Sequence, residues 1–332
     1  MSPERLRALV GDIFIRAGMV EANARTVADV LVWADLRGMG SHGVMRVPRY
    51  VEWMKRGDLN GQPKIKTTAS GATITLDADR AAGPVAMTRA AELAVAKAKE
   101  TGIALVLVRS TTHTGAIGYY TQLGARAGMA TIAITASVPN MAYHGARAAG
   151  VSTAPLSIAV PGEDEPLAVD MGSGVISIGR LAQARRSGET LGAGLALDAK
   201  GEPTTDPKAA SIPLPLGGPK GSGLALLIEC LSSLLAGNPI LSEALEGTAK
   251  GKRHHQNALV IAIDVARFLP LADFKVQVKR LIRNIKALPA DGEILVPGER
   301  GHRHAQRTKD IKLAPSVLEE LTALAKSLGV EA

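Results

Sequence analysis

Apolar residues near the start of the chain recur at spacings of three and four positions, which is the period of a helix that buries one face. A first helix is predicted from Leu6, Leu9, Val10, Ile13 and Phe14, and a second from Val27, Val30, Leu31 and Ala34. Gly38 and Gly40 end the second helix. A third helix is expected from Ser41 to about Lys55, with a kink or restart at Pro48 because proline has no backbone N–H to donate.

From about residue 63 the pattern changes to short alternating or continuous apolar runs that are typical of strands. Strands are predicted at 64–67, 72–76, 103–108, 130–135, 156–160, 167–170 and 258–264. Helical patterns separate them, at about 83–101, 115–128, 176–187, 219–236 and 271–288, and a last amphipathic helix spans about 316–328. The pattern therefore predicts an α/β protein whose mixed middle is flanked by helical ends, and those ends are able to pack together as one lobe.

Composition narrows the class of protein. Of the 332 residues 46% are hydrophobic but only 3% aromatic, so the core is expected to consist of Ala, Val, Leu and Ile. Cys230 is the single cysteine, which excludes an internal disulfide and fits a cytoplasmic location. We expect no membrane partner, because charged residues interrupt each apolar stretch before it reaches the length of a span.

The net charge of +8 is compatible with anionic metabolites and cofactor phosphates as well as with nucleic acid. The two basic clusters, 252–255 and 300–309, lack the stacking aromatic residues that nucleic-acid modules usually carry. We therefore expect no nucleic-acid partner.

Two histidine segments carry the candidate chemistry. Ser41-His42-Gly43 is followed by Arg46 and Tyr50, one and two helical turns later, and His113 follows a predicted buried strand. Histidine is suited to reversible proton transfer near neutral pH, and the planar guanidinium of arginine matches a carboxylate. The pattern indicates a site for a small carboxylated substrate. The alternative for the first segment is a capped helix whose Arg46 and Tyr50 make surface contacts, and the alternative for His113 is a structural histidine in a loop.

Two glycine-rich segments are candidate phosphate sites. Residues 38–43 match G-x-G-x-x-G, but the preceding segment has helical rather than strand periodicity, so we reject a Rossmann dinucleotide site. The turn at 213–224 leads into a helix with Lys220 at the junction, which suits a phosphate or pyrophosphate; a solvated lysine in a Gly/Pro loop is the alternative. No metal site is expected, since the histidines form no ligand motif.

Six motifs in order resemble the malate/L-lactate dehydrogenase family of the second, non-Rossmann type. They are Ser41-His42-Gly43 with Arg46 and Tyr50, the segments 113–120, 169–173, 201–207 and 216–221, and Pro297-Gly298-Glu299-Arg300. The resemblance covers nearly the whole chain. It implies an NAD- or NADP-dependent oxidoreductase that interconverts a 2-oxo acid and a 2-hydroxy acid.

The resemblance also implies an architecture. A helical substrate and dimer domain would comprise residues 1–70 together with 285–332, and a non-Rossmann cofactor domain with a large, mainly antiparallel sheet would comprise residues 71–284. A homodimer, with its active sites near the subunit interface, is expected.

The roles of individual residues follow from the same resemblance. His113 would give or take the substrate proton, Ser41 and His42 would form a supporting pair, and Arg46 and Tyr50 would bind substrate. The positions expected to touch the cofactor are Ser137, Asp170, Met171, Gly172 and Lys220, with Arg303 and Arg307 near an adenosine 2′-phosphate.

Two departures from the family bear on the substrate. Some imine reductases of the family have aspartate where this chain has Arg180, and histidine where it has Arg46. Both differences favour a 2-oxo acid, with a cyclic-imine (Δ1-piperideine-2-carboxylate or Δ1-pyrroline-2-carboxylate) reductase as the alternative. A third departure, Val151 to Pro155 in place of Gly-Thr-Asn-Pro, affects a wall of the substrate or cofactor site.

Overall fold

The computed structural model describes residues 1–249 and 254–331. The chain forms two compact units. Unit 1 comprises Met1–Ala133, Ser157–Asp170 and Val260–Ala332, and unit 2 comprises Ile134–Leu156 and Met171–Leu259. The family resemblance implied a different division, into a helical substrate and dimer domain (1–70 with 285–332) and a cofactor domain (71–284). That division is based on function and stays a prediction.

The predicted α/β class is confirmed. A seven-stranded sheet has the order β1-β2-β3-β12-β4-β7-β8. Its strands are β1 (Lys66–Ser70), β2 (Thr73–Asp77), β3 (Ile103–Thr111), β4 (Met129–Ser137), β7 (Leu156–Val160), β8 (Leu167–Met171) and β12 (Gln256–Asp264). β1 pairs with β2 antiparallel and β2 with β3 parallel, with Leu76 opposite Val108.

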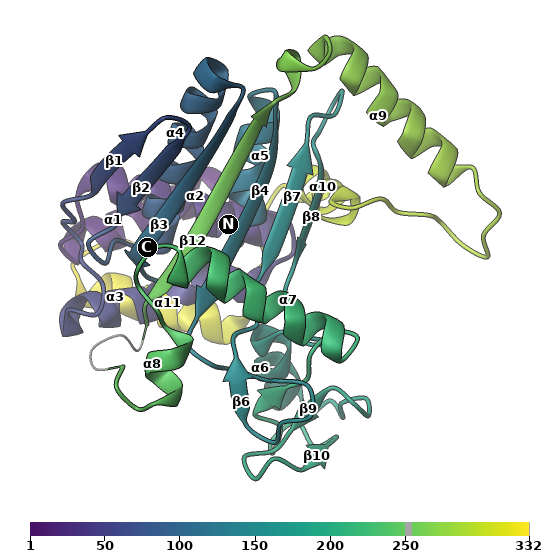
Figure 1. Cartoon of the computed structure of the whole chain (residues 1–332). Coiled ribbons are helices and arrows are strands. Elements are labelled where there is room, and N and C mark those ends of the chain that lie inside the picture. The colour runs from purple at the N-terminus through teal and green to yellow at the C-terminus, as the bar shows by residue number, and fades with distance from the viewer. Residues whose placement is uncertain (250–253, 332) are drawn as a thin grey trace. The chain divides into compact units, whose positions relative to one another are not determined.

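Helices of unit 1 cover one face of this sheet and enclose a core (Figure 1). Helix α4 (Gly83–Thr101) packs on β2 and β3, and α5 (Gly118–Arg126) and α2 (Glu21–Leu36) pack on α4. Small buried alanines on α4, including Ala86, Ala90 and Ala94, allow this close packing. The aromatic-poor core predicted from composition is therefore built mainly from aliphatic side chains.

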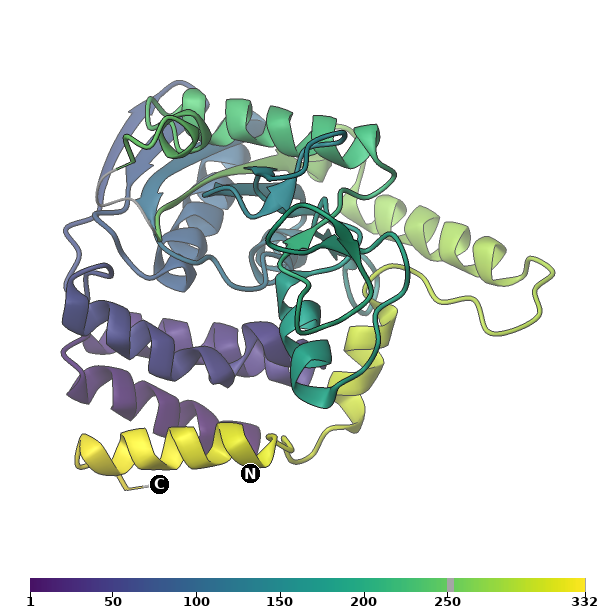
Figure 2. The same cartoon turned by 90° about the horizontal axis from the view of Figure 1, so that it is seen from below.

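Both ends of the chain belong to unit 1. α1 (Pro3–Arg16) begins at Ser2, whose Oγ accepts a hydrogen bond from the Arg5 N–H at 3.2 Å, a typical N-cap. α11 (Pro315–Ser327) contacts α1 and α3 (Val47–Arg56), and Figure 2 shows it alongside α1. The remaining elements of unit 1 are the turn Val265–Arg267, α9 (Leu271–Lys286) and α10 (Glu299–Arg307).

Unit 2 contains short strands and three helices around a smaller core. The strands are β5 (Met141–Ala142), β6 (Ala149–Val151), β9 (Ala196–Leu197), β10 (Pro203–Thr204) and β11 (Ile212–Pro213). The helices are α6 (Ile178–Ser187), α7 (Pro219–Glu229), which continues as a π-helical turn over Cys230–Leu234, and α8 (Leu241–Leu245). One core cluster packs Leu181 and Ala184 of α6 against Ile176 and Leu191.

The predicted third helix is wrong at its start. The segment forms two 3₁₀ turns, Gly40–His42 and Val44–Arg46, and the α-helix begins only at Val47. Gly43 between the turns is extended (φ −91°, ψ −155°), which breaks helical continuity. Pro48 occupies the first helical turn, where its missing N–H costs nothing, so the helix restarts at this point, which is one of the two outcomes expected there, and is not kinked.

Within residues 1–249 and 254–331, every helix is too short or too polar to cross a lipid bilayer. The same part of the chain contains no group of three histidine, cysteine, aspartate or glutamate side chains placed to hold a metal ion.

The core assignment of β2 is testable with Leu76→Ala. The Leu76 side chain is fully buried, so its truncation is expected to lower the free energy of unfolding by about 2–5 kcal/mol. Leu318→Ala on α11 is the control, since 42% of Leu318 is exposed. Chemical denaturation measures both variants, and an equal loss in the two would contradict the burial of β2.

Candidate active site

The predicted histidine segments meet within unit 1. The imidazole rings of His42 and His113 lie nearly parallel, with an interplanar angle of 15° and ring centroids 5.8 Å apart. His42 lies in the 3₁₀ turn after α2, and His113 follows β3. The structure thus brings together two histidines that lie 71 positions apart in the sequence.

Each imidazole has a hydroxyl partner on Nδ1. Ser41 Oγ is 3.0 Å from His42 Nδ1, and Tyr50 Oη is 2.7 Å from His113 Nδ1. Tyr50 Oη is also placed to donate to the His113 carbonyl at 3.2 Å. If the phenol donates to that carbonyl, its oxygen accepts from Nδ1–H both in the imidazolium, which carries a proton on Nε2, and in the neutral ring, whose Nε2 is a base. The contact therefore accommodates both forms that a reversible proton transfer needs.

Tyr50 lies on α3 and is fully buried. The role predicted for it was substrate binding. Burial raises the pKa of its hydroxyl above the usual value, and the charge of Arg46 opposes this shift. A phenol that stays neutral and bonded to His113 orients that ring, so positioning His113 is the contact that the structure provides for Tyr50.

Arg46 supplies the positive charge of the cluster. Its Nε donates to the Ser41 carbonyl at 2.7 Å, which closes the turn that holds His42. Burial and, to a smaller extent, the charge of Arg46 together lower the pKa of His42 to about 4. Burial, followed by the charges of Arg46, His42 and Arg49, lowers the pKa of His113 well below its usual value. A carboxylate beside Arg46 would offset these charge effects and favour the imidazolium that an acid catalyst needs.

A close backbone approach fixes the His113 loop against α4. A Cβ atom on Gly83 would lie 2.2 Å from the His113 carbonyl oxygen and 2.4 Å from Thr114 Cα. Only glycine fits at this contact. The first residue of α4 therefore sets the position of His113, a constraint that its spacing in the sequence did not indicate.

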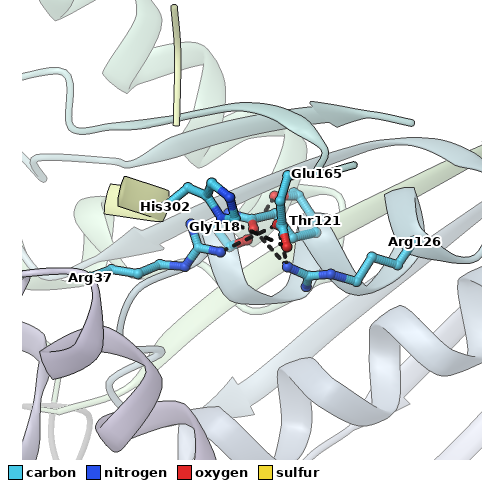
Figure 3. Close-up of polar contacts among 7 residues, drawn as sticks. Arg37, Gly118, Thr121, Arg126, Glu165 and His302 are labelled. Atoms are coloured by element: carbon cyan, nitrogen blue, oxygen red, sulfur yellow. Dashed lines mark hydrogen bonds and ion pairs between the residues drawn. The ribbon is translucent and has the colours of Figure 1, made fainter. Parts of the chain in front are cut away.

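A partly exposed ionic cluster lies at the end of α2, just ahead of the His42 turn (Figure 3). Glu165 lies 3.5 Å from Arg37, the residue that follows α2, 2.8 Å from Arg126 on α5 and 3.7 Å from His302 on α10, measured between side-chain nitrogen and oxygen atoms. Arg37, with a side chain only 8% exposed, also stacks over Trp33. The cluster joins three helices at the point from which the candidate turn departs.

The expected cofactor residues fall in both units. Asp170 of unit 1 accepts a hydrogen bond from the Gly118 N–H, at the start of α5, at 2.8 Å. Desolvation raises the pKa of Asp170 to about 6 and this hydrogen bond opposes the shift, while the side chain keeps access to solvent. Ser137 lies at the end of β4 in unit 2, partly buried, with its Oγ donating to the Val138 carbonyl.

Unit 2 brings the Met171–Gly172 segment close to the turn that carries Lys220. Ser173 donates its N–H to the Thr153 carbonyl and accepts from the Leu216 N–H, both at 2.9 Å. A Cβ atom on Gly221 would lie 2.5 Å from the Ser173 carbonyl oxygen. Among the described residues the buried Ser173 Oγ has no hydrogen-bond partner, and a bound molecule is one way to satisfy such an atom. These features fit a nicotinamide cofactor.

The basic segment after Glu299 forms α10, which the hydrophobic pattern did not predict. Arg303 pairs with Glu299 at 2.5 Å and with Glu293 at 2.6 Å. Arg307 lines a cavity beside α2. A phosphate on Arg303 would compete with two carboxylates, and the contact of both arginines with a 2′-phosphate stays a prediction.

This combination, two imidazoles with hydroxyl partners beside a guanidinium, has the chemistry that was predicted for a carboxylated substrate. Comparison with known proteins specifies the class. Residues 1–322 match the family model described as malate/L-lactate dehydrogenase, and the chain belongs to that family.

Several relatives are similar over nearly their whole length. The L-sulfolactate dehydrogenase of Methanocaldococcus jannaschii is 37% identical over 99% of this chain and 97% of its own. Its solved structure superposes with a TM-score of 0.90, covering 100% of this chain and 98% of that one. The NAD(+)-dependent ureidoglycolate dehydrogenase of Escherichia coli (strain K12) is 36% identical over 90% of this chain and 87% of its own. The Δ1-pyrroline-2-carboxylate/Δ1-piperideine-2-carboxylate reductase of Pseudomonas putida is 32% identical over 98% and 95%.

These findings confirm the predicted class, an NAD(P)-dependent 2-hydroxy acid dehydrogenase. The same group of relatives also includes the imine reductase that was the alternative expectation.

The lowered pKa of His42 predicts a pH-dependent stability. Between its usual pKa of about 6.5 and its folded value of about 4, the unfolded state binds more protons than the folded state. The contribution of His42 to stability is therefore fully present above about pH 6.5 and is lost as the pH falls towards 4, by at most about 3 kcal/mol. Denaturation of the protein and of His42→Asn at several pH values measures this difference. A free-energy difference that does not change with pH would contradict the buried, neutral imidazole.

Proposed function

We propose that this protein reduces a 2-oxo acid to the 2-hydroxy acid, and catalyses the reverse oxidation, with His113 as the proton donor and acceptor. The single observation that carries the proposal is the stacked pair of His42 and His113, whose pKa values both respond to the charge of Arg46. An enzyme that reduces a 2-oxo acid needs one group that polarises the carbonyl and one group that holds the carboxylate.

Each residue of the site has a separate role in the proposed reaction. Arg46 binds the substrate carboxylate with its planar guanidinium and fixes the reacting face. Tyr50 orients His113, and Ser41 orients His42, whose ring forms the wall opposite His113. During reduction His113 delivers a proton to the carbonyl oxygen, and during oxidation it takes that proton back.

The nicotinamide cofactor, NAD or NADP, supplies or accepts the hydride when it is bound. Ser137, Met171, Gly172 and Lys220 of unit 2 and Asp170 of unit 1 would hold it, with Arg303 and Arg307 towards the adenosine end. The fold that serves this function is proposed to be the non-Rossmann cofactor domain with a helical domain from both termini. A homodimer in the cytoplasm is the proposed assembly.

Specificity is testable with a substrate panel. Purified protein is mixed with NADH or NADPH and with pyruvate, oxaloacetate, sulfopyruvate or a cyclic imine, and loss of the reduced cofactor is followed by absorbance. We expect turnover with 2-oxo acids, because Arg46 and the histidine pair suit a carboxylate beside a carbonyl. Turnover with cyclic imines alone would favour the reductase of the Pseudomonas putida relative instead.

The role of His113 is testable by substitution. His113→Asn keeps a polar side chain but removes the acid, so kcat for the best acid is expected to fall by about 10²–10⁴-fold. His42→Asn is the paired variant. A loss confined to His42→Asn would assign the proton to His42 and contradict the role proposed for His113.

A further inference from the structure

Asp35, in the last turn of α2, contacts the candidate catalytic turn directly. Its Oδ2 accepts a hydrogen bond from the Val44 N–H at 2.8 Å. Val44 lies between His42 and Arg46, and its amide begins the second 3₁₀ turn. A single carboxylate on α2 thus holds the backbone midway between the two residues that the proposed reaction uses.

The turn and the carboxylate are closely interlocked. A Cβ atom on Gly43 would lie 2.0 Å from Asp35 Oδ1, 2.2 Å from its carboxyl carbon and 2.4 Å from Oδ2. The carboxyl group of Asp35 therefore occupies the space that a side chain at residue 43 would need. The Gly43 backbone is accordingly pressed against a charged group, with no intervening side chain to adjust.

Asp35 stands where a carboxylate is electrostatically unfavourable. The C-terminal end of a helix carries partial negative charge, and the last turn of α2 has no basic residue. Burial raises the pKa of Asp35 to about 6, opposed by the hydrogen bond from Val44, and no charged side chain contributes to the shift. The Asp35 carboxylate is electrostatically unfavourable in its own helix, and its hydrogen bond is to a single backbone amide. Its presence is therefore better explained by the geometry that it imposes on the turn than by a gain in stability.

We propose that Asp35 is a positioning residue for the active site, whose ionised carboxylate keeps the His42–Arg46 turn in its catalytic shape and whose protonation loosens it. The proposal rests on the function proposed above, since it regulates the same site. Hydrogen bonds to an ionised acceptor are about twice as strong as those to a neutral one, so protonation weakens the hold on Val44. Arg46 and His42 then lose the fixed separation that substrate binding requires.

Protons reach Asp35 from a cavity of about 610 Å³ on the side of unit 1 where α2 faces α10. The titratable and charged groups that share this cavity are His304, Arg307, Lys309, Asp310 and Lys312. In the turn itself, the charged or titratable residues nearest to Val44 along the chain are His42 and Arg46. The cavity gives the carboxylate access to water, so Asp35 is able to exchange its proton in the folded protein.

Variants of Asp35 give the first test. Asp35→Ala removes the anchor and is expected to lower kcat/KM for the preferred acid by about 10- to 100-fold, because displacement of catalytic groups by about 1 Å has effects of that size. Asp35→Asn keeps an acceptor oxygen and should retain more activity than the alanine variant. The matched control is Asp29→Asn, which also removes a carboxylate from α2 but from an exposed pair with Arg7. Activity within twofold of wild type in Asp35→Ala would overturn the proposal.

The thermal midpoint separates positioning from a structural role. At pH 8 the buried carboxylate is ionised, so Asp35→Asn is expected to unfold at a temperature no lower than that of the wild type while being less active. A structural residue would show the opposite, a lowered Tm. Equal losses of stability and activity in Asp35→Asn would overturn the proposal.

The pH profile of the reverse reaction gives the second test. In oxidation of the 2-hydroxy acid, kcat/KM reports the free enzyme. Burial and the charge of Arg46 lower the pKa of His42 to about 4 and that of His113 well below its usual value, so both imidazoles are neutral near pH 6. A fall in kcat/KM as the pH decreases through about 6 is therefore assigned to Asp35. Asp35→Asn should lack this fall. A fall of the same size in Asp35→Asn would overturn the assignment.

An NMR titration of the wild-type protein tests the anchor without any activity. The Val44 amide should shift with a midpoint near pH 6, because its acceptor changes charge there. An amide that does not respond overturns the anchor even in an active enzyme. If the amide responds but no 2-oxo acid is turned over, the anchor stands and the proposed function falls.

Discussion

The contact on which the candidate site depends is the hydrogen bond between the fully buried Tyr50 and His113. It joins α3 to the loop after β3, two segments 63 positions apart in the chain. Because a buried hydroxyl and a buried imidazole are costly without partners, each stabilises the other in one arrangement. The position of His113 is consequently set by helix packing rather than by its own loop.

Three further constraints act on the same few atoms. Gly83 brings the start of α4 against the His113 backbone, Asp35 holds the turn that carries His42, and Arg46 closes that turn through the Ser41 carbonyl. The Glu165 cluster fixes the end of α2 from which the turn departs. Two imidazoles with low pKa values are thus preorganised around a guanidinium, and a bound carboxylate completes the charge balance.

The elements with a strong hydrophobic period were predictable from the sequence. α1, α2 and α4, and strands such as β3 and β12, follow from which positions are apolar, because burial of one face decides their structure. The turns from Gly40 to Arg46 were not predictable, since they depend on a carboxylate on α2, on the missing Cβ of Gly43 and on Pro48 at the first turn of α3. The strongly basic α10 has almost no apolar face and gave no periodic signal.

Part of the site was likewise predictable. Residue chemistry identified His42, Arg46 and His113 as candidates, and their convergence follows from the packing of α2 and α3 around the loop after β3. The partner of Tyr50 was not evident, because spacing along a helix shows which residues share a face but not what the face meets. Asp35 and Gly83 were missed for the same reason: each acts through a backbone atom of a distant segment.

The most direct measurement of the central claim is a crystal structure of the protein with its reduced cofactor and oxamate, a stable analogue of a 2-oxo acid. The account predicts the oxamate carboxylate on the guanidinium of Arg46 and its carbonyl oxygen within hydrogen-bond distance of His113 Nε2. Oxamate bound away from these residues, or His42 and His113 no longer facing each other in the complex, would contradict it.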